Sequence, residues 1–253
     1  MIAWLLDGDP AIRWQVLNDL TDASPAEVLA ERARVEHEGW GARLLALEAA
    51  DGLWAGGACF PASYTGGGPG QPWTPTMHTL QTLQLLGLDP ASESARRAIA
   101  LVAENGSVRS SFDTTINVLE GLAEFERATN GTDDVRAARR SGEEYLLERD
   151  LFRRRSTGDV AKPAYLELAF PYYWHYDVLR ALDYFRRSGA EPDRRMEEAI
   201  EVVRSKRQPD GTWLLDRVHP GDVHFELEGG VGTPSRWNTL RALRMLRWWD
   251  GTA

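Results

Sequence analysis

The chain has 253 residues, 43% of them hydrophobic, and no linker rich in Pro, Gly or Ser interrupts it, so we expect a single domain over residues 1–253 with a large core. The 38 acidic and 29 basic side chains give a net charge of −9 without a block of either sign, which argues against nucleic-acid binding. The single cysteine, Cys59, excludes an internal disulfide and any zinc site built from several cysteines.

The N-terminus predicts no targeting or membrane segment. Residues 1–7 contain no basic residue and their apolar run is too short for a signal peptide. No apolar run elsewhere reaches the roughly 18 residues of a membrane span. We therefore expect a cytoplasmic protein without an integral membrane segment, whose oligomeric state the sequence leaves open.

Five segments along the chain share one helical pattern. In each, a polar residue is followed by Val-Leu or Thr-Leu and, three residues after that Leu, by a second Leu. The last copy lies in an amphipathic stretch, residues 235–247, where Trp237, Leu240 and Leu243 form one apolar stripe. A pattern repeated at intervals of 63, 39, 60 and 61 residues is typical of a repeat architecture. The aligned polar residues are Gln15, His78, Asn117, Asp177 and Asn238.

Taken in chain order, the elements form repeated pairs. Asp9 and Pro10 predict the N-cap and first residue of the first inner helix. Each later inner helix follows an outer helical stretch, a turn and, except before Asn117, a long loop. Equivalent positions in a repeat lie on one face, so the long loops should meet at one end. The outer stretches are predicted at 25–37 with 41–49, at 92–104, at 134–148 and at 193–206, and the long loops at 55–73, 153–171 and 214–234.

A turn motif gives the chain a resemblance to a known family. Gln208-Pro-Asp-Gly-Thr-Trp213 resembles the Gln-Trp motif of squalene cyclases and related terpenoid cyclases, and Asp51-Gly-Leu-Trp54 resembles a partial second copy. The resemblance implies an all-α fold, an α/α toroid of about five inner helices, with outer helices around them and long loops at one end. In that family the motif joins outer to inner helices, and the enzymes are cyclases of isomerase or lyase type. The same toroid also serves protein prenylation and non-catalytic binding.

The resemblance also indicates candidate acids. Class II terpenoid cyclases start their reaction with a buried, protonated Asp of an Asp-x-Asp-Asp-Thr motif, and aromatic faces stabilise the cations that follow. Asp113-Thr114 resembles the end of that motif, but Phe112 stands where the proton donor should be, and Asp-x-Asp-Asp occurs nowhere in the chain. The candidate catalytic residues are therefore Asp113 together with Asp177 and His78. The alternatives are a helix N-cap for Asp113 and a buried, hydrogen-bonded histidine for His78.

Residues 170–177 hold the densest group of aromatic side chains. We predict that Phe170-Pro-Tyr-Tyr-Trp-His-Tyr-Asp177 forms the opening turns of an inner helix, with Tyr173 and Asp177 on the same side. The alternative is an aromatic core in which Asp177 bonds Arg236 or Asn238. The predicted substrate-binding residues are Trp73, Asn117, Tyr173, Trp174, His175, Arg236, Trp237 and Asn238.

Two further motifs bear on cofactors. His219 and His224, with Glu226, could hold a metal ion, but their spacing fits no helical zinc motif and ordinary loop hydrogen bonding is the favoured alternative. The glycine run at 64–70 is followed by no Lys-Ser or Lys-Thr, which argues against a phosphate loop. We expect no metal and no cofactor.

Two functional hypotheses follow. The first is a terpenoid-cyclase-like enzyme that binds an apolar small molecule in a central cavity and catalyses acid-initiated cyclisation or isomerisation. The second is a non-catalytic α/α toroid that binds a small molecule or another protein. An aromatic-lined cavity of roughly several hundred Å³ would favour the enzyme, and a central space filled by side chains would favour the binding protein.

Overall fold

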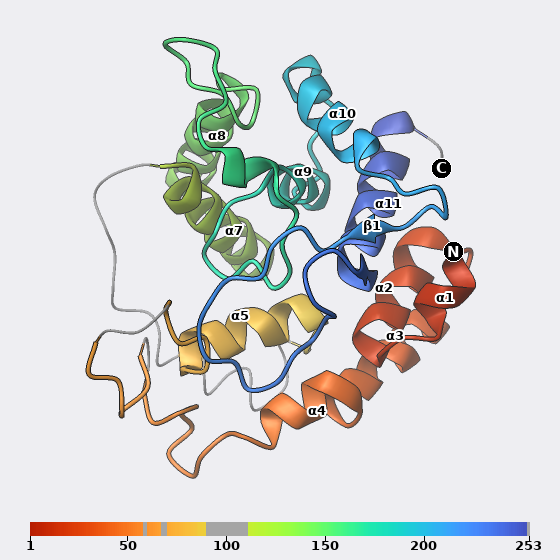
Figure 1. The fold of residues 1–253 in the computed structure, drawn as a ribbon, viewed down its shortest axis with the longest axis vertical. Coiled ribbons are helices and arrows are strands. Elements are labelled where there is room, and N and C mark those ends of the chain that lie inside the picture. Colours follow the sequence, from red (N-terminus) through yellow and green to blue (C-terminus); the bar gives the residue numbers. More distant parts are fainter. Residues whose placement is uncertain (58–59, 67–69, 90–110, 252–253) are drawn as a thin grey trace.

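The computed structural model describes residues 1–57, 60–66, 70–89 and 111–251. They are mainly helical, as the predicted all-α class requires (Figure 1). The outer stretch predicted at 92–104 lies outside the described residues. The described helices are α1 (Ile2–Leu6), α2 (Pro10–Leu20), α3 (Pro25–Ala33), α4 (Gly39–Leu45), α5 (Thr76–Leu86), α7 (Phe112–Thr129), α8 (Asp133–Leu147), α9 (Val178–Arg187), α10 (Glu197–Ser205) and α11 (Arg236–Asp250). Short 3-10 helices lie at η1 (Arg34–Glu36), η2 (Pro163–Leu166) and η3 (Arg194–Met196), and strand β1 (Trp213–Leu214) pairs antiparallel with β2 (Pro234–Ser235).

Local sequence signals set where helices begin and end. Asp9 caps α2 by accepting the Ala11 N–H at 2.9 Å, and Pro10 is the first helical residue, as predicted. Gly87 ends α5 with a φ of +97°. A Cβ at Gly87 would lie 2.3 Å from the ring of Trp14, so glycine is required there by both the backbone conformation and the close packing of α2.

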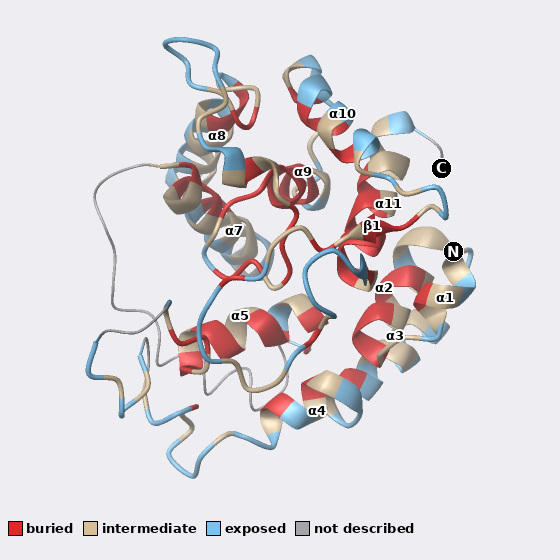
Figure 2. Cartoon of the chain, in the orientation of Figure 1, coloured by how far each residue is buried: buried red, intermediate tan, exposed pale blue. Residues whose placement is uncertain are grey.

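The predicted inner helices are neighbours in space. α2 packs against α11, α11 against α9, and α9 against α7. α5 is joined to α2, because the side chains of Trp14 and Gln15 donate to the carbonyls of Leu86 and Leu85 at 2.8 and 3.1 Å. The outer helices lie beside them, α3 on α2, α8 on α7 and α10 on α9. Buried residues accordingly dominate α9, whereas α8 and α10 carry many exposed ones (Figure 2).

Two tryptophans join outer helices to inner ones. The Trp213 indole N–H donates to the carbonyl of Val203 in α10 at 2.7 Å, and its backbone N–H donates to the Thr239 hydroxyl in α11 at 2.9 Å. The Trp54 indole donates in the same way to the Leu44 carbonyl in α4, and its backbone N–H donates to the Thr76 hydroxyl in α5. Both rings are fully buried, so each also fills the space between its two helices.

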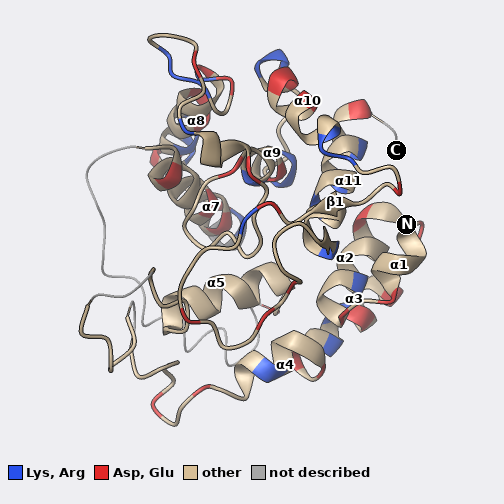
Figure 3. Cartoon of the chain, in the orientation of Figure 1, with Lys and Arg blue, Asp and Glu red and all other residues tan. Residues whose placement is uncertain are grey.

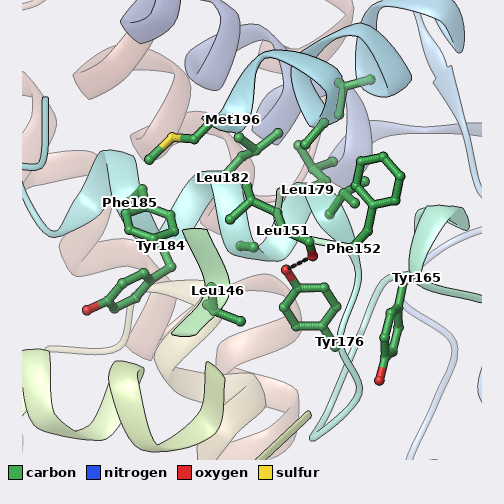
Figure 4. Packing of buried hydrophobic residues seen from close by; sticks show 14 of the residues in the cluster. Leu146, Leu151, Phe152, Tyr165, Tyr176, Leu179, Leu182, Tyr184, Phe185 and Met196 are labelled. Carbon is green, nitrogen blue, oxygen red and sulfur yellow. Dashed lines mark hydrogen bonds between the residues drawn. The ribbon is translucent and has the colours of Figure 1, made fainter. Parts of the chain in front are cut away.

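The apolar core between α7, α8, α9 and α10 is shown in Figure 4. Tyr176, Leu179, Leu182 and Phe185 are each at most 3% exposed. The Tyr176 hydroxyl donates to the Leu151 carbonyl, which satisfies its polar end inside the core. Burial of each such side chain stabilises the fold by about 1.5–3 kcal/mol.

The segment before α9 differs from its prediction. Residues 170–176 are not helical, and α9 begins only at Val178. Asp177 is the N-cap, because its carboxylate accepts the N–H of Arg180 at 2.7 Å. Tyr173, with a φ of +46°, lies in the irregular segment before this cap. The prediction that Tyr173 and Asp177 share one helix face was therefore wrong.

Candidate functional site

Aromatic rings from separate segments of the chain meet at one end of α5. Trp73 stacks on Tyr173 with ring centroids 4.2 Å apart, and His78 of α5 lies edge-on to Trp73 at 5.0 Å. His175 stacks on His219 at 3.7 Å. Trp73 and His219 belong to two of the predicted long loops, whereas Tyr173 and His175 follow the predicted loop at 153–171. We call this group the aromatic–histidine cluster; its members are Trp73, His78, Tyr173, Trp174, His175 and His219.

His78 is a buried histidine with both ring nitrogens bonded. Its Nε2 lies 2.9 Å from the Gln71 side-chain nitrogen, and its Nδ1 lies 3.2 Å from Gln81 Oε1. Gln71 Oε1 accepts the Trp174 indole N–H at 3.2 Å, which fixes the Gln71 amide group as the donor to Nε2. Burial lowers the pKa of His78, in agreement with a neutral ring. These contacts agree with the buried, hydrogen-bonded histidine that was the alternative to catalysis.

His175 and His219 are neutral at physiological pH. Burial lowers the pKa of His175 to about 4. Burial, and then the neighbouring His175, lower the pKa of His219 to about 3. His219 is 7% exposed, and its buried Nε2 has no hydrogen-bond partner in the part of the chain that the structure describes. Among the described residues it is the one fully buried side-chain nitrogen or oxygen of the cluster without a hydrogen-bond partner.

A segment of the loop between β1 and β2 lies over the cluster. We call residues 218–229 the covering loop; in Figure 1 the loop that contains it runs across α5. Trp73 donates from its backbone N–H to the Asp222 carbonyl at 2.8 Å and from its indole to the Pro220 carbonyl at 3.1 Å. His224 Nε2 lies 3.0 Å from the Thr79 hydroxyl of α5. Backbone and side-chain contacts thus hold the covering loop on α5 and on the loop before it.

Two hollows are lined by residues of the covering loop, and Tyr173 lines both. Each has a volume of about 20 Å³, which is room for about one water molecule. Tyr173, Phe225 and Leu227 line both. The first hollow is also lined by His219 and Glu226, and the second by Trp73 and His224. Neither approaches the roughly 300–1,000 Å³ of a ligand-sized pocket.

Arginines fill the space between the inner helices. Arg244 of α11 lies 2.7 Å from Asp183 of α9 and donates to Gln15 of α2 at 2.6 Å. Arg180 of α9 lies 2.6 Å from Glu120 of α7. Both arginines are at most 7% exposed. The charged residues of α7, α9 and α11 contrast with α5, which carries none (Figure 3). Charge-assisted hydrogen bonds thus link α7 to α9 and link α11 to both α9 and α2.

Four of the five aligned polar residues contact a buried arginine, namely Gln15, Asn117, Asp177 and Asn238. Asn117 accepts from Arg180 at 3.0 Å and donates to the Trp174 carbonyl, which brings it beside the cluster that contains His78. Asn238 donates to the carbonyls of Leu168 and Leu214 and lies 3.4 Å from Arg241. His78 lies in the aromatic–histidine cluster, and its hydrogen bonds in the described part of the chain go to none of these arginines. The sequence analysis did not identify Gln71, Arg180 or Asp183. Arg180 and Asp183 could have been found, because they are charged residues three apart on a helix that was predicted to be an inner one.

Asp177 is buried and is used by the fold. Burial raises the pKa of its carboxyl, whereas Arg241 at 3.7 Å and the backbone N–H groups of Arg180 and Ala169 act in the opposite direction. We assign the carboxylate as ionised, because a neutral Asp177 would leave Arg241, which is 2% exposed, without a charge partner. The predicted partners Arg236 and Asn238 were wrong: the charged partner is Arg241.

Asp113 joins the start of α7 to the loop predicted at 153–171 and to the segment just before α9. Its Oδ1 accepts the Tyr176 N–H at 2.9 Å, and its Oδ2 accepts the Tyr165 hydroxyl at 3.1 Å and the Lys162 ammonium at 3.2 Å. The N-cap of α7 is Ser111, so the N-cap alternative for Asp113 was wrong. Both carboxylate oxygens are bonded, and a cation is one of their partners.

The remaining predicted residues lie on the side of the molecule near the N-terminus. Trp237 stacks on Phe170 with centroids 4.4 Å apart. Arg236 lies over the ring of Trp4 in α1 at 4.7 Å and donates to its carbonyl. Neither has a described contact with the aromatic–histidine cluster. The predicted substrate-binding residues therefore do not form one site: Arg236 and Trp237 lie apart from Trp73, Tyr173, Trp174 and His175.

The histidines of the covering loop do not form a metal site with Glu226. His219 stacks on His175, whereas His224 is bonded to Thr79. Among the described residues, no group of three or more His, Cys, Asp or Glu side chains is placed to hold a metal ion.

Comparison with family models, with curated proteins and with solved structures finds no match. None of the described helices is long and apolar enough to cross a membrane.

Proposed function

We propose that the protein is a non-catalytic α/α-toroid binding protein that holds a small molecule at the aromatic–histidine cluster, beneath the covering loop. The observation that carries this proposal is the bonding of the two candidate acids. Asp113 is bonded to Lys162, Tyr165 and a backbone N–H, and Asp177 caps α9 beside Arg241. Neither is the free, protonated acid that alkene protonation requires.

The order of the inner helices supports the toroid. In space the inner helices follow one another as α5, α2, α11, α9 and α7. Along the chain their order is α2, α5, α7, α9 and α11, so the spatial order is the chain order read backwards around a ring in which α11 lies beside α2. Trp54 and Trp213 make equivalent bonds in the first and last pairs, as the resemblance to the Gln-Trp motif implies. Five inner helices around one axis would place all three long loops at one end.

The packing between the inner helices argues against a cyclase. An isoprenoid substrate would need a cavity of roughly several hundred Å³ in contact with a general acid. Arg180, Arg241 and Arg244 occupy that region together with their partners. Removing these charges from their partners to admit an apolar molecule would cost about 3–5 kcal/mol for each broken buried pair.

The covering loop is the better place for a ligand. The two hollows beneath it share Pro171, Tyr173, Val223 and Phe225 in their walls, so an outward movement of the loop would enlarge both. Gly221 with a φ of +139° and Gly232 with a φ of +84° stand near its ends, where glycines can absorb such a movement. Aromatic faces and neutral imidazoles suit an uncharged ligand of mainly apolar character.

The test is native mass spectrometry of the freshly purified protein. We expect a mass increment from a retained small molecule in the wild type, lost in Tyr173→Ala and kept in the control Leu29→Ala, whose side chain is 63% exposed on α3. A spectrum without an increment, combined with conversion of an isoprenoid that depends on Asp113, would contradict the proposal.

A further inference from the structure

The bonding capacity of His219 indicates what the ligand must supply. Buried polar atoms in folded proteins almost always have a hydrogen-bond partner, and leaving one without a partner costs about 1–3 kcal/mol. His219 Nε2 is buried and has no partner in the described parts of the chain. His219 lines the first hollow, but Nε2 itself is not exposed there, so a bonding group in the hollow reaches it once the covering loop or the ring moves.

The walls of this hollow are apolar apart from a few groups. Phe170, Leu215 and Val218 are among the apolar lining residues. The other polar side chains are those of Tyr173, Glu226 and Glu228, and Glu228 is already bonded to Ser235 and to the Trp237 N–H. Burial and then the charge of Glu226 raise the pKa of Tyr173, so its hydroxyl stays neutral. The hollow thus offers neutral bonding partners in apolar surroundings.

The charges around the hollow discriminate between polar groups. A carboxylate or phosphate would lie beside Glu226 and Glu228, which line the same wall. An ammonium would face Glu226 and Glu228, but it would lose its water shell in a small and mainly apolar hollow, a cost that Coulomb attraction often does not repay. A hydroxyl carries no charge, and because it can both donate and accept, it matches either tautomer of His219. Its size also suits a volume of about 20 Å³.

We infer that the first hollow receives the hydroxyl group of an otherwise apolar alcohol, bonded to His219 Nε2. The apolar part of the alcohol then lies along Tyr173 and Phe225 toward the second hollow, which those two residues also line. This inference rests on the proposed function and adds the chemical class of the ligand.

The inference is tested by calorimetric titration of the whole protein with 1-hexanol, n-hexane, hexylamine and hexanoate. We expect 1-hexanol to bind at least tenfold more tightly than the other three. His219→Leu should abolish this preference, and the matched control His37→Leu, at an exposed position of the chain, should keep it. In ¹⁵N spectra of the histidine-labelled wild type, the Nε2 signal of His219 should shift on addition of 1-hexanol, a readout that does not depend on how any variant folds.

Three results would overturn the inference. Equal affinity for 1-hexanol and n-hexane would show that the hydroxyl has no partner. Tighter binding of hexylamine or hexanoate would show that a charged group is preferred. Binding of 1-hexanol without a shift of the His219 signal would place it elsewhere. The proposed function is judged separately by the mass increment and its loss in Tyr173→Ala, so the two can fail independently.

Discussion

At the scale of single residues, each of the two candidate acids is hydrogen-bonded to other parts of the fold. Asp113 accepts from Lys162, from Tyr165 and from the backbone N–H of Tyr176, and Asp177 accepts from the first turn of its own helix. The sequence identified both as buried or capping carboxylates, but it could not show which cation faces each of them. Arg241 lies more than sixty residues from Asp177 along the chain, and only the packing of α11 on α9 brings the two together.

Asp177→Asn tests this reading of the carboxylate. Asparagine can still cap α9, so the substitution removes mainly the charge opposite Arg241. We expect the free energy of unfolding to fall by about 3–5 kcal/mol, the cost of an uncompensated buried charge. Urea denaturation measures this, with Asp134→Asn at the exposed start of α8 as a control that should change it by less than about 0.5 kcal/mol. A loss below about 1 kcal/mol would show that Asp177 is neutral in the native protein.

At the scale of elements, the helices followed from sequence better than the loops did. The predicted outer stretch at 134–148 agrees with α8, because its amphipathic pattern and the Thr132 cap act locally. Residues 170–177 were predicted as helix because Asp177 aligns with the inner-helix positions of the other repeats. The start of α9 depends on Asp177 acting as its cap, and the path of residues 170–176 depends on stacking of Tyr173 against Trp73 from another loop. Such contacts between distant segments leave no local pattern.

Gly221→Ala tests how the covering loop is anchored. A Cβ at this position would lie 1.8 Å from the Gln71 carbonyl oxygen, and the φ of +139° is unfavourable for alanine. We expect a loss of about 1–3 kcal/mol in the free energy of unfolding. Gly230→Ala, in the same loop but with open space around its Cβ, should have little effect. Equal stability of the two variants would mean that the covering loop does not rest on Gln71.

Acid should destabilise the packed loops through their histidines. Unfolded histidine has a pKa near 6.5, whereas His175 and His219 in the folded protein have pKa values of about 4 and about 3. Above pH 6.5 both states bind no proton at these rings and the stabilisation is complete. As the pH falls from 6.5 toward 4, the unfolded chain takes up protons that the folded one does not, so stability is lost by at most about 1.4 kcal/mol per pH unit per histidine.

Urea unfolding at pH 7.5, 5.5 and 4.5 measures this loss. The variant with both His175→Phe and His219→Phe should be less sensitive to pH over this range, since phenylalanine keeps the ring stack without a titrating group. Its remaining pH dependence reports carboxylates such as Glu228, whose pKa burial raises. The same slope in wild type and variant would contradict the assignment of neutral, buried rings.

At the scale of the whole molecule, the repeat is what the sequence conveyed best. The five aligned polar residues were predicted to lie together, and four of them, with Arg180, Arg241 and Arg244 between them, form contacts across α2, α7, α9 and α11. The sequence could not show that the expected apolar cavity is filled by arginines, because a row of arginines on a helix is equally compatible with a solvent-exposed face. These arginines are buried only because other helices supply carboxylates, such as Asp183.

Arg244 should be central to the contact between the first and last inner helices. Its neighbours are Asp183 at 2.7 Å and Gln15 at 2.6 Å, and its charge, acting against burial, helps to hold the pKa of Asp183 below its usual range. We expect Arg244→Met to cost about 3–5 kcal/mol, because Asp183 is left with a less buried partner, Arg186. The double variant Arg244→Met with Asp183→Leu should recover most of this loss. Additive losses in the double variant would refute a coupled buried pair.

The central claim is that the molecule binds its ligand beneath the covering loop and not between the inner helices. The most direct measurement is a crystal structure of the protein as purified and after soaking with 1-hexanol. We predict electron density under residues 218–229, in contact with Tyr173 and His219, with Arg180 and Arg244 still paired. Density for an apolar molecule between the inner helices, with Asp113 or Asp177 released from its partners and facing it, would contradict the account.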